Sequence, residues 1–326
     1  MPKLNMVKAL NLAMHEEMAR DASVVVLGED VGRVGGVFRV TEGLLEKFGK
    51  KRVIDTPVSE AGILGCAVGM ALNGLKPIAE IQFSGFMFNG YHQLNCHAAR
   101  FRYRSWGRHG VPMVMRAPIG GGIRALEHHN DSEEAVYVQS PGLKAVYPST
   151  PKTAHGLLLA AIRDPDPVMF LEPKRVYRAP VEEVEEGGEA WPIGKARTLR
   201  HGNHLTLISW GAMLQESLEA AEQAAKESHI ECDVIDLLSI VPMDTEAIVA
   251  SVAKTGRCVI VHEAPAACGV GSEIIARINE HILDRLQAPV ARVTGWDMPY
   301  PFFARESGYL PNVSRILDAI RQTVDY

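Results

Sequence analysis

The sequence predicts an α/β protein made of two α/β domains with mostly parallel sheets. Short β-branched runs alternate with longer segments of helical period, a pattern typical of βαβ units. The runs are apolar throughout, as expected for parallel strands buried on both faces. The chain has 326 residues, enough for about two domains of roughly 150 residues. Between Arg178 and Arg200 the alternation gives way to the acidic stretch VEEVEEGGEAWPIG, where we expect a domain boundary.

The first domain is predicted to span residues 1–185. It opens with an amphipathic helix over residues 6–19, in which Leu10, Met14 and Met18 lie one turn apart. Thr56-Pro57 predicts a helix N-cap followed by proline in the first turn, and Asn73-Gly74 predicts the end of that helix. The other predicted strands are 24–27, 52–55, 77–82, 112–116, 143–147 and 168–171, and the other predicted helices are 88–101 and 151–163.

The second domain is predicted to span residues 186–326, after a linker at about residues 178–200. Its predicted strands are 205–210, 232–237, 258–262 and 290–294, and its predicted helices are 212–228, 244–255, 272–286 and 313–323. No internal repeat or coiled-coil heptad is found, so the two domains are separate α/β units.

Composition excludes several classes of protein. Subtracting 39 acidic from 34 basic residues gives a net charge of −5, and 47% of residues are hydrophobic. A mildly acidic globular chain has no general electrostatic attraction to nucleic acid or to anionic lipid. The longest uncharged stretch, residues 81–99, is too polar to span a membrane. Five cysteines without a C-x-x-C pair, and no secretory signal at the N-terminus, predict a cytoplasmic protein.

Glu60 stands at the start of the helix predicted after Thr56-Pro57. A glutamate there can simply complement the helix dipole from the surface. The body of this helix is uncharged, however, which predicts that it is buried. A buried carboxyl group has a raised pKa and can share a proton with a bound base. Gly65 and Gly69 on the same helix predict close helix packing, including packing at a subunit interface.

His128 and His129 follow the glycine-rich loop GGGIRALE. Such a loop histidine is commonly solvated, yet loops at strand ends of α/β sheets are where ligands bind. A metal site formed by His92, His97, His128, His129 and Asp131 is an alternative, although no motif of fixed ligand spacing supports it.

The segment RFRYRSWGRHG mixes basic and aromatic residues. Such mixtures can bind single-stranded nucleic acid. In an acidic chain we interpret these arginines as structural, pairing with carboxylates at a helix end or interface. The arginines of this segment are Arg100, Arg102, Arg104 and Arg108. A dinucleotide fingerprint, a phosphate loop and a nucleophile elbow are all absent.

Eight segments, in collinear order, are specific enough to indicate a family. They are VVVLGEDVGRVGGVFRVTEGL, KFGKKRVIDTPVSEAGILGCAVGMALNG, AEIQF, RYRSWG, PGLKAVYPSTP, DPDPVMFLEPKRVYR, KTGRCVIVHEA and RVTGWDMPYP. From about Leu4 to the last residue, the chain resembles the beta subunits of thiamine-diphosphate-dependent 2-oxo acid dehydrogenases. The resemblance implies a pyrimidine-binding domain followed by a transketolase C-terminal-like domain.

The resemblance also implies the reaction. It is the oxidative decarboxylation of a small 2-oxo acid, pyruvate in the first place, with acyl transfer to a lipoyl-acyltransferase core. Branched-chain 2-oxo acids and acetoin are the alternatives. GWDMPYP resembles the branched-chain group, whereas YPSTP and WGAMLQESLEAA resemble pyruvate-type chains.

One absence points to a partner. Enzymes of this cofactor class hold the magnesium-bound diphosphate with a G-D-G motif and a downstream asparagine, and this chain has no G-D-G. The resemblance therefore implies an alpha subunit that holds the diphosphate and magnesium. The active site would lie at the interface of an α₂β₂ heterotetramer.

Individual roles are implied by position in the family motifs. Glu60 corresponds to the glutamate that bonds the pyrimidine ring nitrogen, and Gln82 and Phe86 to residues lining the pyrimidine pocket. His129 corresponds to a histidine near the substrate carboxylate or the lipoyl acceptor. Two alternatives remain, a histidine-metal hydrolase and a non-catalytic interaction protein. The presence of Glu60 and His129 together argues against the second, and stoichiometric zinc binding by the chain alone would favour the first.

Two motifs depart from the family pattern, and one ion site is implied. Many relatives have H-S-Q-S where this chain has His129-Asn130-Asp131-Ser132, and an aspartate in place of the histidine of His92-Gln93. Substrate preference is open for that reason. Relatives bind a structural potassium ion at the loop corresponding to Ala161, Ile162, Asp164 and Asp166, largely through backbone carbonyls.

Overall fold

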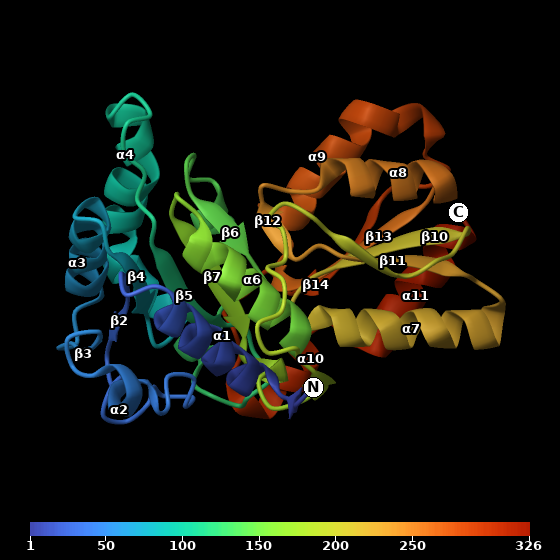
Figure 1. Cartoon of the computed structure of the whole chain (residues 1–326). Helices are drawn as coiled ribbons and strands as arrows, with labels where there is room; N and C mark the ends of the chain where they lie inside the picture. The colour runs from blue at the N-terminus through green and yellow to red at the C-terminus, as the bar shows by residue number, and fades with distance from the viewer. The chain divides into compact units, whose positions relative to one another are not determined.

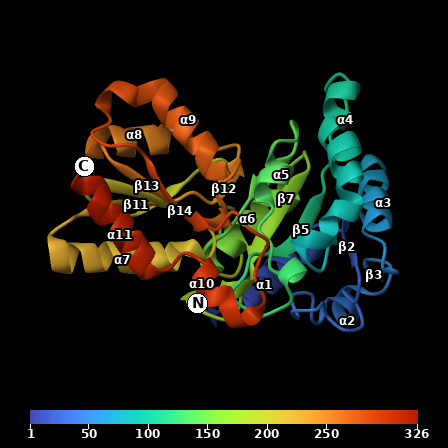
Figure 2. The same cartoon turned by 180° about the vertical axis from the view of Figure 1, so that it is seen from behind.

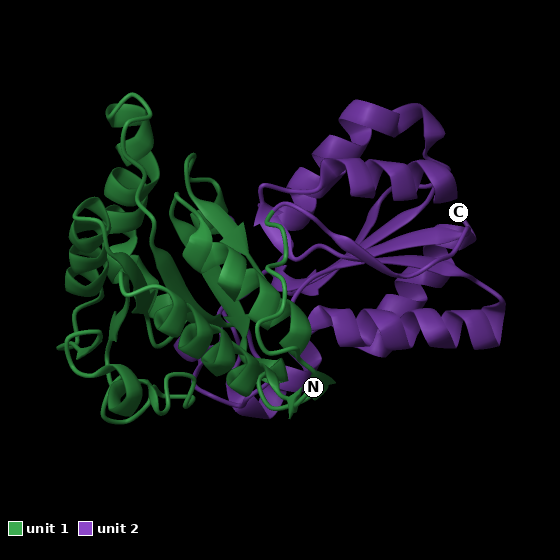
Figure 3. Ribbon diagram, in the orientation of Figure 1, with its two compact units in different colours: residues 1–119, 136–193 green, residues 120–135, 194–326 purple.

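The computed structural model describes residues 1–326, which form two compact units (Figure 3). Unit 1 comprises Met1–Ile119 and Val136–Ile193, and unit 2 comprises Gly120–Ala135 and Gly194–Tyr326. The change of unit after Ile193 lies within the predicted linker. The acidic stretch begins in the first unit, because its strand β8 (Glu182–Glu183) pairs with β1 (Lys3–Leu4) near the start of the chain. The sequence did not indicate that residues 120–135 group with the second unit.

Unit 1 is built on a parallel sheet in the order β6-β7-β5-β4-β2-β3. Every residue of β2, β5 and β7 is buried, which explains their continuous apolar character. The strands are β2 (Val24–Gly28), β3 (Val53–Asp55), β4 (Lys76–Glu80), β5 (Val114–Ile119), β6 (Lys144–Val146) and β7 (Val168–Pro173).

Helices cover both faces of this sheet. α1 (Met6–Arg20) and α6 (Pro151–Arg163) pack side by side in front of the strands in Figure 1. α4 (Ala99–Arg104) rises above the strands both in Figure 1 and in Figure 2. α3 (Glu60–Leu72) packs against β4, and the short α2 (Leu44–Phe48) against β3. The doubly wound arrangement agrees with the predicted fold class.

α3 begins later than the sequence predicted. Its N-cap is Ser59, whose Oγ accepts a hydrogen bond of 3.3 Å from the Gly62 amide. Thr56 and Pro57 precede the helix, so the predicted Thr56 cap was wrong. The chain has two capping side chains three residues apart, and the serine that directly precedes Glu60 is the one that caps.

The helix predicted over residues 88–101 is divided into three pieces. They are the 3₁₀ segment η1 (Ser84–Gly90), the π-helical segment η2 (Gln93–Ala98) and α4. Close packing on α3 accounts for the irregular start. A Cβ atom on Gly90 would lie 2.9 Å from the Glu60 carbonyl oxygen and 2.5 Å from Leu64 Cδ1. Only glycine allows η1 to approach the first turn of α3 so closely.

Unit 2 contains a second sheet in the order β14-β13-β10-β11-β9. Only β9, which the sequence analysis missed, runs antiparallel to its neighbour. α8 and α9 cover one face of the sheet and α7 and α11 the other (Figure 1). These elements are β9 (Arg197–Arg200), β10 (Leu205–Ser209), β11 (Cys232–Asp236), β13 (Cys258–Pro265), β14 (Ala291–Gly295), α7 (Met213–Ser228), α8 (Thr245–Thr255), α9 (Val270–Ile282) and α11 (Val313–Val324).

The remaining elements are short. They are η3 (Glu127–His129), α5 (Glu134–Val138), η4 (Lys174–Val176), β12 (Ser239–Val241), η5 (Leu283–Arg285), η6 (Phe303–Arg305) and α10 (Glu306–Tyr309). None of the helices is both long enough and apolar enough to cross a lipid bilayer.

The centre of the first sheet contains a buried charge network. Arg116 on β5 donates to Glu80 on β4 at 2.6 Å and to both carboxylate oxygens of Glu172 on β7, at 2.6 and 2.9 Å. The Tyr177 hydroxyl also donates to Glu172, at 2.5 Å. Arg116 is 1% exposed and Glu172 is 0% exposed. The network joins three adjacent strands next to the strand ends that carry the candidate site.

Candidate active site

Glu60 is the first residue of α3, where the parallel strands end. Its side chain is 8% exposed and accepts a hydrogen bond from Asn89 Nδ2, with 3.4 Å between the nitrogen and Glu60 Oε2. Such a long bond leaves most of the carboxylate's acceptor capacity unused. The carboxyl group is therefore nearly buried, at a helix N-terminus, and able to bond an incoming donor.

Glu29 is a second acidic residue of this region, which the sequence analysis did not single out. It directly follows β2 and is 8% exposed. Burial raises the pKa of its carboxyl group, and the negative charges of Glu60 and Asp30 raise it further. Its place after a buried strand, in the motif GEDVG, was the signal that could have found it. Two neighbouring carboxyl groups can hold a shared proton more easily than either alone.

The strand ends are brought together by glycine. Gly28, the last residue of β2, pairs with Glu80, the last residue of β4. A Cβ atom on Gly28 would lie 2.6 Å from the Glu80 carbonyl oxygen, so a larger residue would push the two strand ends apart. The loops that follow β2 and β4 therefore leave the sheet at the same edge.

Gln82 and Phe86 follow β4 in the first unit. Gln82 is half-buried, two residues after the strand ends, and Phe86 is half-buried within η1. The Phe86 ring contacts the Phe83 ring edge to face, with 5.5 Å between the centroids. Because η1 packs on the first turn of α3, these residues and Glu60 belong to the same end of unit 1.

His129 lies in a different unit from Glu60. It ends the 3₁₀ turn η3, is half-buried, and its amide donates to the Leu126 carbonyl at 2.9 Å. His128 next to it is exposed, and its Nδ1 lies 3.8 Å from Asp131 Oδ2. The structure thus groups Glu60, Gln82 and Phe86 in unit 1 and places His129 on a loop of unit 2.

The loop implied to bind potassium has its carboxylates already engaged. Both oxygens of Asp164 lie 2.7 Å from Lys144 Nζ, and Asp166 Oδ1 accepts from Arg102 Nε at 2.5 Å. Any potassium ion there would depend on backbone carbonyls such as those of Ala161 and Ile162. Ala161 already accepts from the Asp164 amide, at 3.3 Å.

The histidine metal alternative is not supported by the geometry. No group of three or more histidine, cysteine, aspartate or glutamate side chains is arranged to hold a metal ion. The His92 and His97 rings contact each other edge to face, with centroids 5.1 Å apart. All five cysteines are free thiols. In the arginine segment, Arg102 forms an ion pair with Asp166, as the structural interpretation of these arginines predicts.

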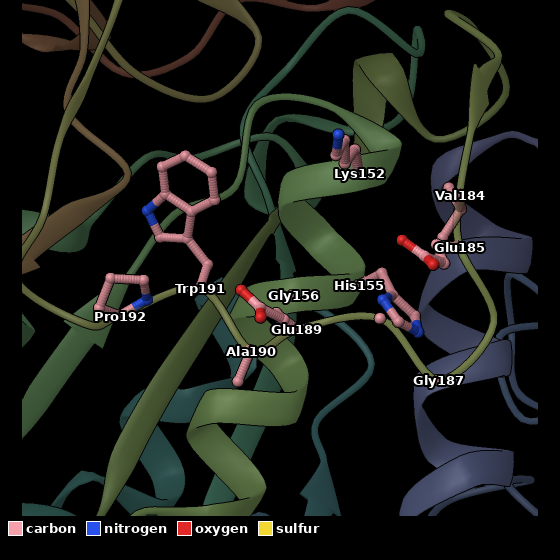
Figure 4. A pocket seen from close by; sticks show the side chains of 11 residues that line it. Lys152, His155, Gly156, Val184, Glu185, Gly187, Glu189, Ala190, Trp191 and Pro192 are labelled. Atoms are coloured by element: carbon pink, nitrogen blue, oxygen red, sulfur yellow. The ribbon is translucent and has the colours of Figure 1, made fainter.

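A separate cavity of about 590 Å³ opens on unit 1, between α6 and residues 184–192 (Figure 4). His155 forms part of its wall and lies 2.9 Å from Glu16 Oε2 through Nε2. None of the sequence-predicted site residues lines this cavity. We therefore assign the candidate site to the strand ends and not to this cavity.

The fold and these strand-end residues define the class of protein. Residues 2–180 match the transketolase pyrimidine-binding domain, and residues 194–316 match the transketolase C-terminal domain. The chain therefore belongs to the proteins with transketolase-type domains.

Curated relatives specify the family further. The chain is 49% identical to "Pyruvate dehydrogenase E1 component subunit beta" of Acholeplasma laidlawii, over 98% of this chain and 97% of that protein. It is 46% identical to the protein of the same name from Staphylococcus epidermidis, over 100% of both. It is 45% identical to "2-oxoisovalerate dehydrogenase subunit beta" of Pseudomonas aeruginosa, over 99% of this chain and 95% of that one. The chain is a member of the beta-subunit family of 2-oxo acid dehydrogenases.

A solved structure agrees in fold. "Split gene transketolase, inactive beta4 tetramer" superposes with a TM-score of 0.81, covering 99% of both chains, at 21% sequence identity. This likeness concerns the two-domain α/β architecture alone.

The residues present fit an aminopyrimidine. Glu60 is a nearly buried carboxylate with spare acceptor capacity, and an aminopyrimidine whose ring nitrogen carries a proton can donate a hydrogen bond to such a group. Phe86 presents a half-buried ring on the element packed against Glu60. The donor set of unit 1 therefore suits the pyrimidine end of thiamine diphosphate, the cofactor on which this family depends.

Proposed function

We propose that this chain is the beta subunit of a 2-oxo acid dehydrogenase, and that with an alpha subunit it carries out oxidative decarboxylation of pyruvate. The observation that supports this best is the 49% identity to a pyruvate dehydrogenase beta subunit over nearly the whole of both chains. The two transketolase-type domains support the dependence on thiamine diphosphate.

Glu60 is the residue to which we assign the central role. Thiamine diphosphate, when bound, supplies the electron sink for the loss of carbon dioxide from a 2-oxo acid. Glu60 accepts a hydrogen bond from the pyrimidine ring nitrogen and holds a proton there. Gln82 and Phe86 orient the ring beside it. Glu29, whose pKa is raised by burial and by the charge of Glu60, places a second carboxyl group in the electrostatic field of Glu60.

His129 acts at the substrate side of the site. A half-buried imidazole can bond a carboxylate when protonated and can donate a proton at neutral pH. We assign it to the substrate carboxylate or to the lipoyl acceptor during acyl transfer.

The chain requires a partner under this proposal. It has no G-D-G motif, so an alpha subunit supplies the ligands for magnesium and the diphosphate within an α₂β₂ heterotetramer. The acyl group passes to a lipoyl-acyltransferase core. A structural potassium ion at Ala161–Asp166 and a cytoplasmic location stay predictions.

Branched-chain 2-oxo acids are the second candidate substrates. The 45% identity to a 2-oxoisovalerate dehydrogenase beta subunit supports them, since it is only slightly below the 49% and 46% identities to two pyruvate dehydrogenase beta subunits. Acetoin is the third candidate. The side chains that contact the substrate include those of the alpha subunit, and they decide among the three.

A substrate panel on the co-expressed alpha and beta chains tests the proposal. The assay is the reduction of an artificial electron acceptor that depends on a 2-oxo acid. We expect the largest kcat/KM with pyruvate. A preference for 2-oxoisovalerate would move the chain to the branched-chain group, and no turnover of any 2-oxo acid by the loaded pair would contradict the proposed function.

A further inference from the structure

The loop that carries His129 is closed on itself. We call residues 120–131 the glycine loop. The Gly120 amide donates to the Asp131 carbonyl at 3.2 Å, which joins the two ends of the loop. Asn130 is 1% exposed, and its side-chain amide donates to the Ala125 and Leu126 carbonyls at 3.0 and 3.2 Å. The residue beside His129 is thus an internal tie.

A buried carboxylate of α10 holds the first half of this loop. Glu306 is 6% exposed. Its Oε1 accepts from the Gly122 amide at 2.9 Å and from the Tyr300 hydroxyl at 2.7 Å, and its Oε2 accepts from the Arg124 amide at 3.2 Å. Burial and this bond to Glu306 raise the pKa of Tyr300, so its hydroxyl remains a donor.

A second carboxylate reaches the neighbouring amide from β13. Glu263 is 7% exposed, and its Oε2 accepts from the Gly121 amide at 3.0 Å. A Cβ atom on Gly121 would lie 1.9 Å from the Tyr300 hydroxyl oxygen, so only glycine fits under the ring. Three loop amides are therefore held by two nearly buried carboxylates.

Glu306 accepts these hydrogen bonds from neutral groups, two backbone amides and a tyrosine hydroxyl. Burying a carboxylate without a cation is costly, and three hydrogen bonds are what offset the cost. Most surface loops are mobile and are not held by buried carboxylates, so these hydrogen bonds indicate that the position of the glycine loop matters. All of these contacts lie within unit 2.

We propose that Glu306, supported by Glu263, is a positioning residue that fixes the glycine loop and thereby His129 for the reaction. This inference rests on the proposed function of His129. It also gives Asn130, where the chain departs from the H-S-Q-S of many relatives, a structural role as the internal tie of the same loop.

The first test measures the loop and not the reaction. Glu306→Ala and Glu306→Gln beta chains are co-expressed with the alpha subunit, with Glu273→Gln, an exposed glutamate of α9, as the matched control. We expect hydrogen exchange over residues 121–124 to speed up by at least ~10-fold in Glu306→Ala, and trypsin to cleave after the exposed Arg124. Glu306→Gln keeps an acceptor oxygen and should lie between Glu306→Ala and the wild type. Unchanged exchange and cleavage in Glu306→Ala would overturn the proposal.

The second test asks whether Glu306 acts through His129. Acylation of a lipoyl domain is measured for Glu306→Ala, His129→Ala and the double variant. Misplacement by about 1 Å can cost about 10²-fold in rate, so we expect a loss of that order in Glu306→Ala. The double variant should be no slower than His129→Ala alone. Multiplicative losses would show that Glu306 acts independently of His129 and would overturn the proposal.

The two tests separate the inference from the function beneath it. Suppose that His129→Ala retains full activity while hydrogen exchange over residues 121–124 still speeds up in Glu306→Ala. The proposed role of His129 is then wrong, and the contacts of Glu306 with the glycine loop have no catalytic purpose. If His129→Ala is impaired but Glu306→Ala is not, the proposed function stands and the positioning role is wrong.

Discussion

Among single residues, Glu60 is distinguished by a carboxylate that has few hydrogen-bond partners within the chain. Its bond to Asn89 is long, and no cation pairs with it. This contrasts with Glu172, which is fully buried and is saturated by Arg116 and Tyr177. A carboxylate with unused acceptor capacity can serve a ligand, whereas a saturated one serves the fold.

Replacing Glu60 by glutamine should therefore spare the fold and impair the reaction. Glutamine keeps the shape but cannot share the proton in the same way, so we expect kcat of the alpha–beta assembly to fall by about 10²- to 10⁴-fold. Steady-state kinetics with pyruvate measure this. Glu46→Gln, at an exposed position of α2, is the control. Near wild-type turnover in Glu60→Gln would refute the assigned role.

Glu134 provides a pH-dependent prediction. The residue is 1% exposed, and burial raises the pKa of its carboxyl group from 4.5 to about 7. Between these values the folded chain keeps a proton that the unfolded chain has released. The free energy of unfolding should therefore fall as pH rises from about 4.5 to 7 and stay reduced above that, by about 3 kcal/mol at most.

Glu134→Gln stays uncharged at every pH and should remove this dependence. Urea unfolding at about pH 5 and about pH 8 measures it. We expect the variant to gain stability over the wild type at the higher pH only. A difference between variant and wild type that is the same at both pH values would contradict the raised pKa.

At the scale of elements, the Arg116 network joins the strands that support the site. Arg116→Ala would leave Glu80 and Glu172 buried without their cation, which typically costs about 3–5 kcal/mol of unfolding free energy. Arg104→Ala removes an exposed arginine and should change it by at most about 0.5 kcal/mol. Denaturant unfolding of both variants makes the comparison. Equal, small losses would show that the network contributes little.

Element positions were predictable where local signals were strong. The β-branched runs indicated β2, β5, β7, β10, β11 and β13, and Thr150-Pro151 fixed the start of α6 through a capping box. The division of residues 84–104 into 3₁₀, π and α segments was not predictable, because it follows from the contact of Gly90 with α3. β9 was missed because a half-exposed edge strand carries no apolar run.

The candidate site was only partly predictable. Glu60 and His129 were indicated by an uncharged helix and a glycine-rich loop, whereas Gln82, Phe86 and all four roles came from family motifs. The roles remain proposals. Glu29 had a local signal in its place after a buried strand, whereas Glu263 and Glu306 were not distinguished from surface glutamates by their neighbours in the sequence. Their importance comes from tertiary burial and from amides far away in the chain, as with Glu306 and Gly122.

At the scale of the whole molecule, the chain supplies one part of the proposed active site. Its strand-end carboxylates suit the pyrimidine end of the cofactor, and it lacks the motif that holds the diphosphate end. An enzyme divided in this way is inactive until its chains meet, so activity should depend on the concentrations of both subunits.

Reconstitution measures this dependence most directly. The beta chain is titrated into a fixed amount of the alpha subunit with thiamine diphosphate, magnesium and pyruvate, and reduction of an artificial acceptor is followed. We predict no turnover by either chain alone, and a rise that saturates at one beta chain per alpha chain. Turnover by the beta chain alone would contradict the account.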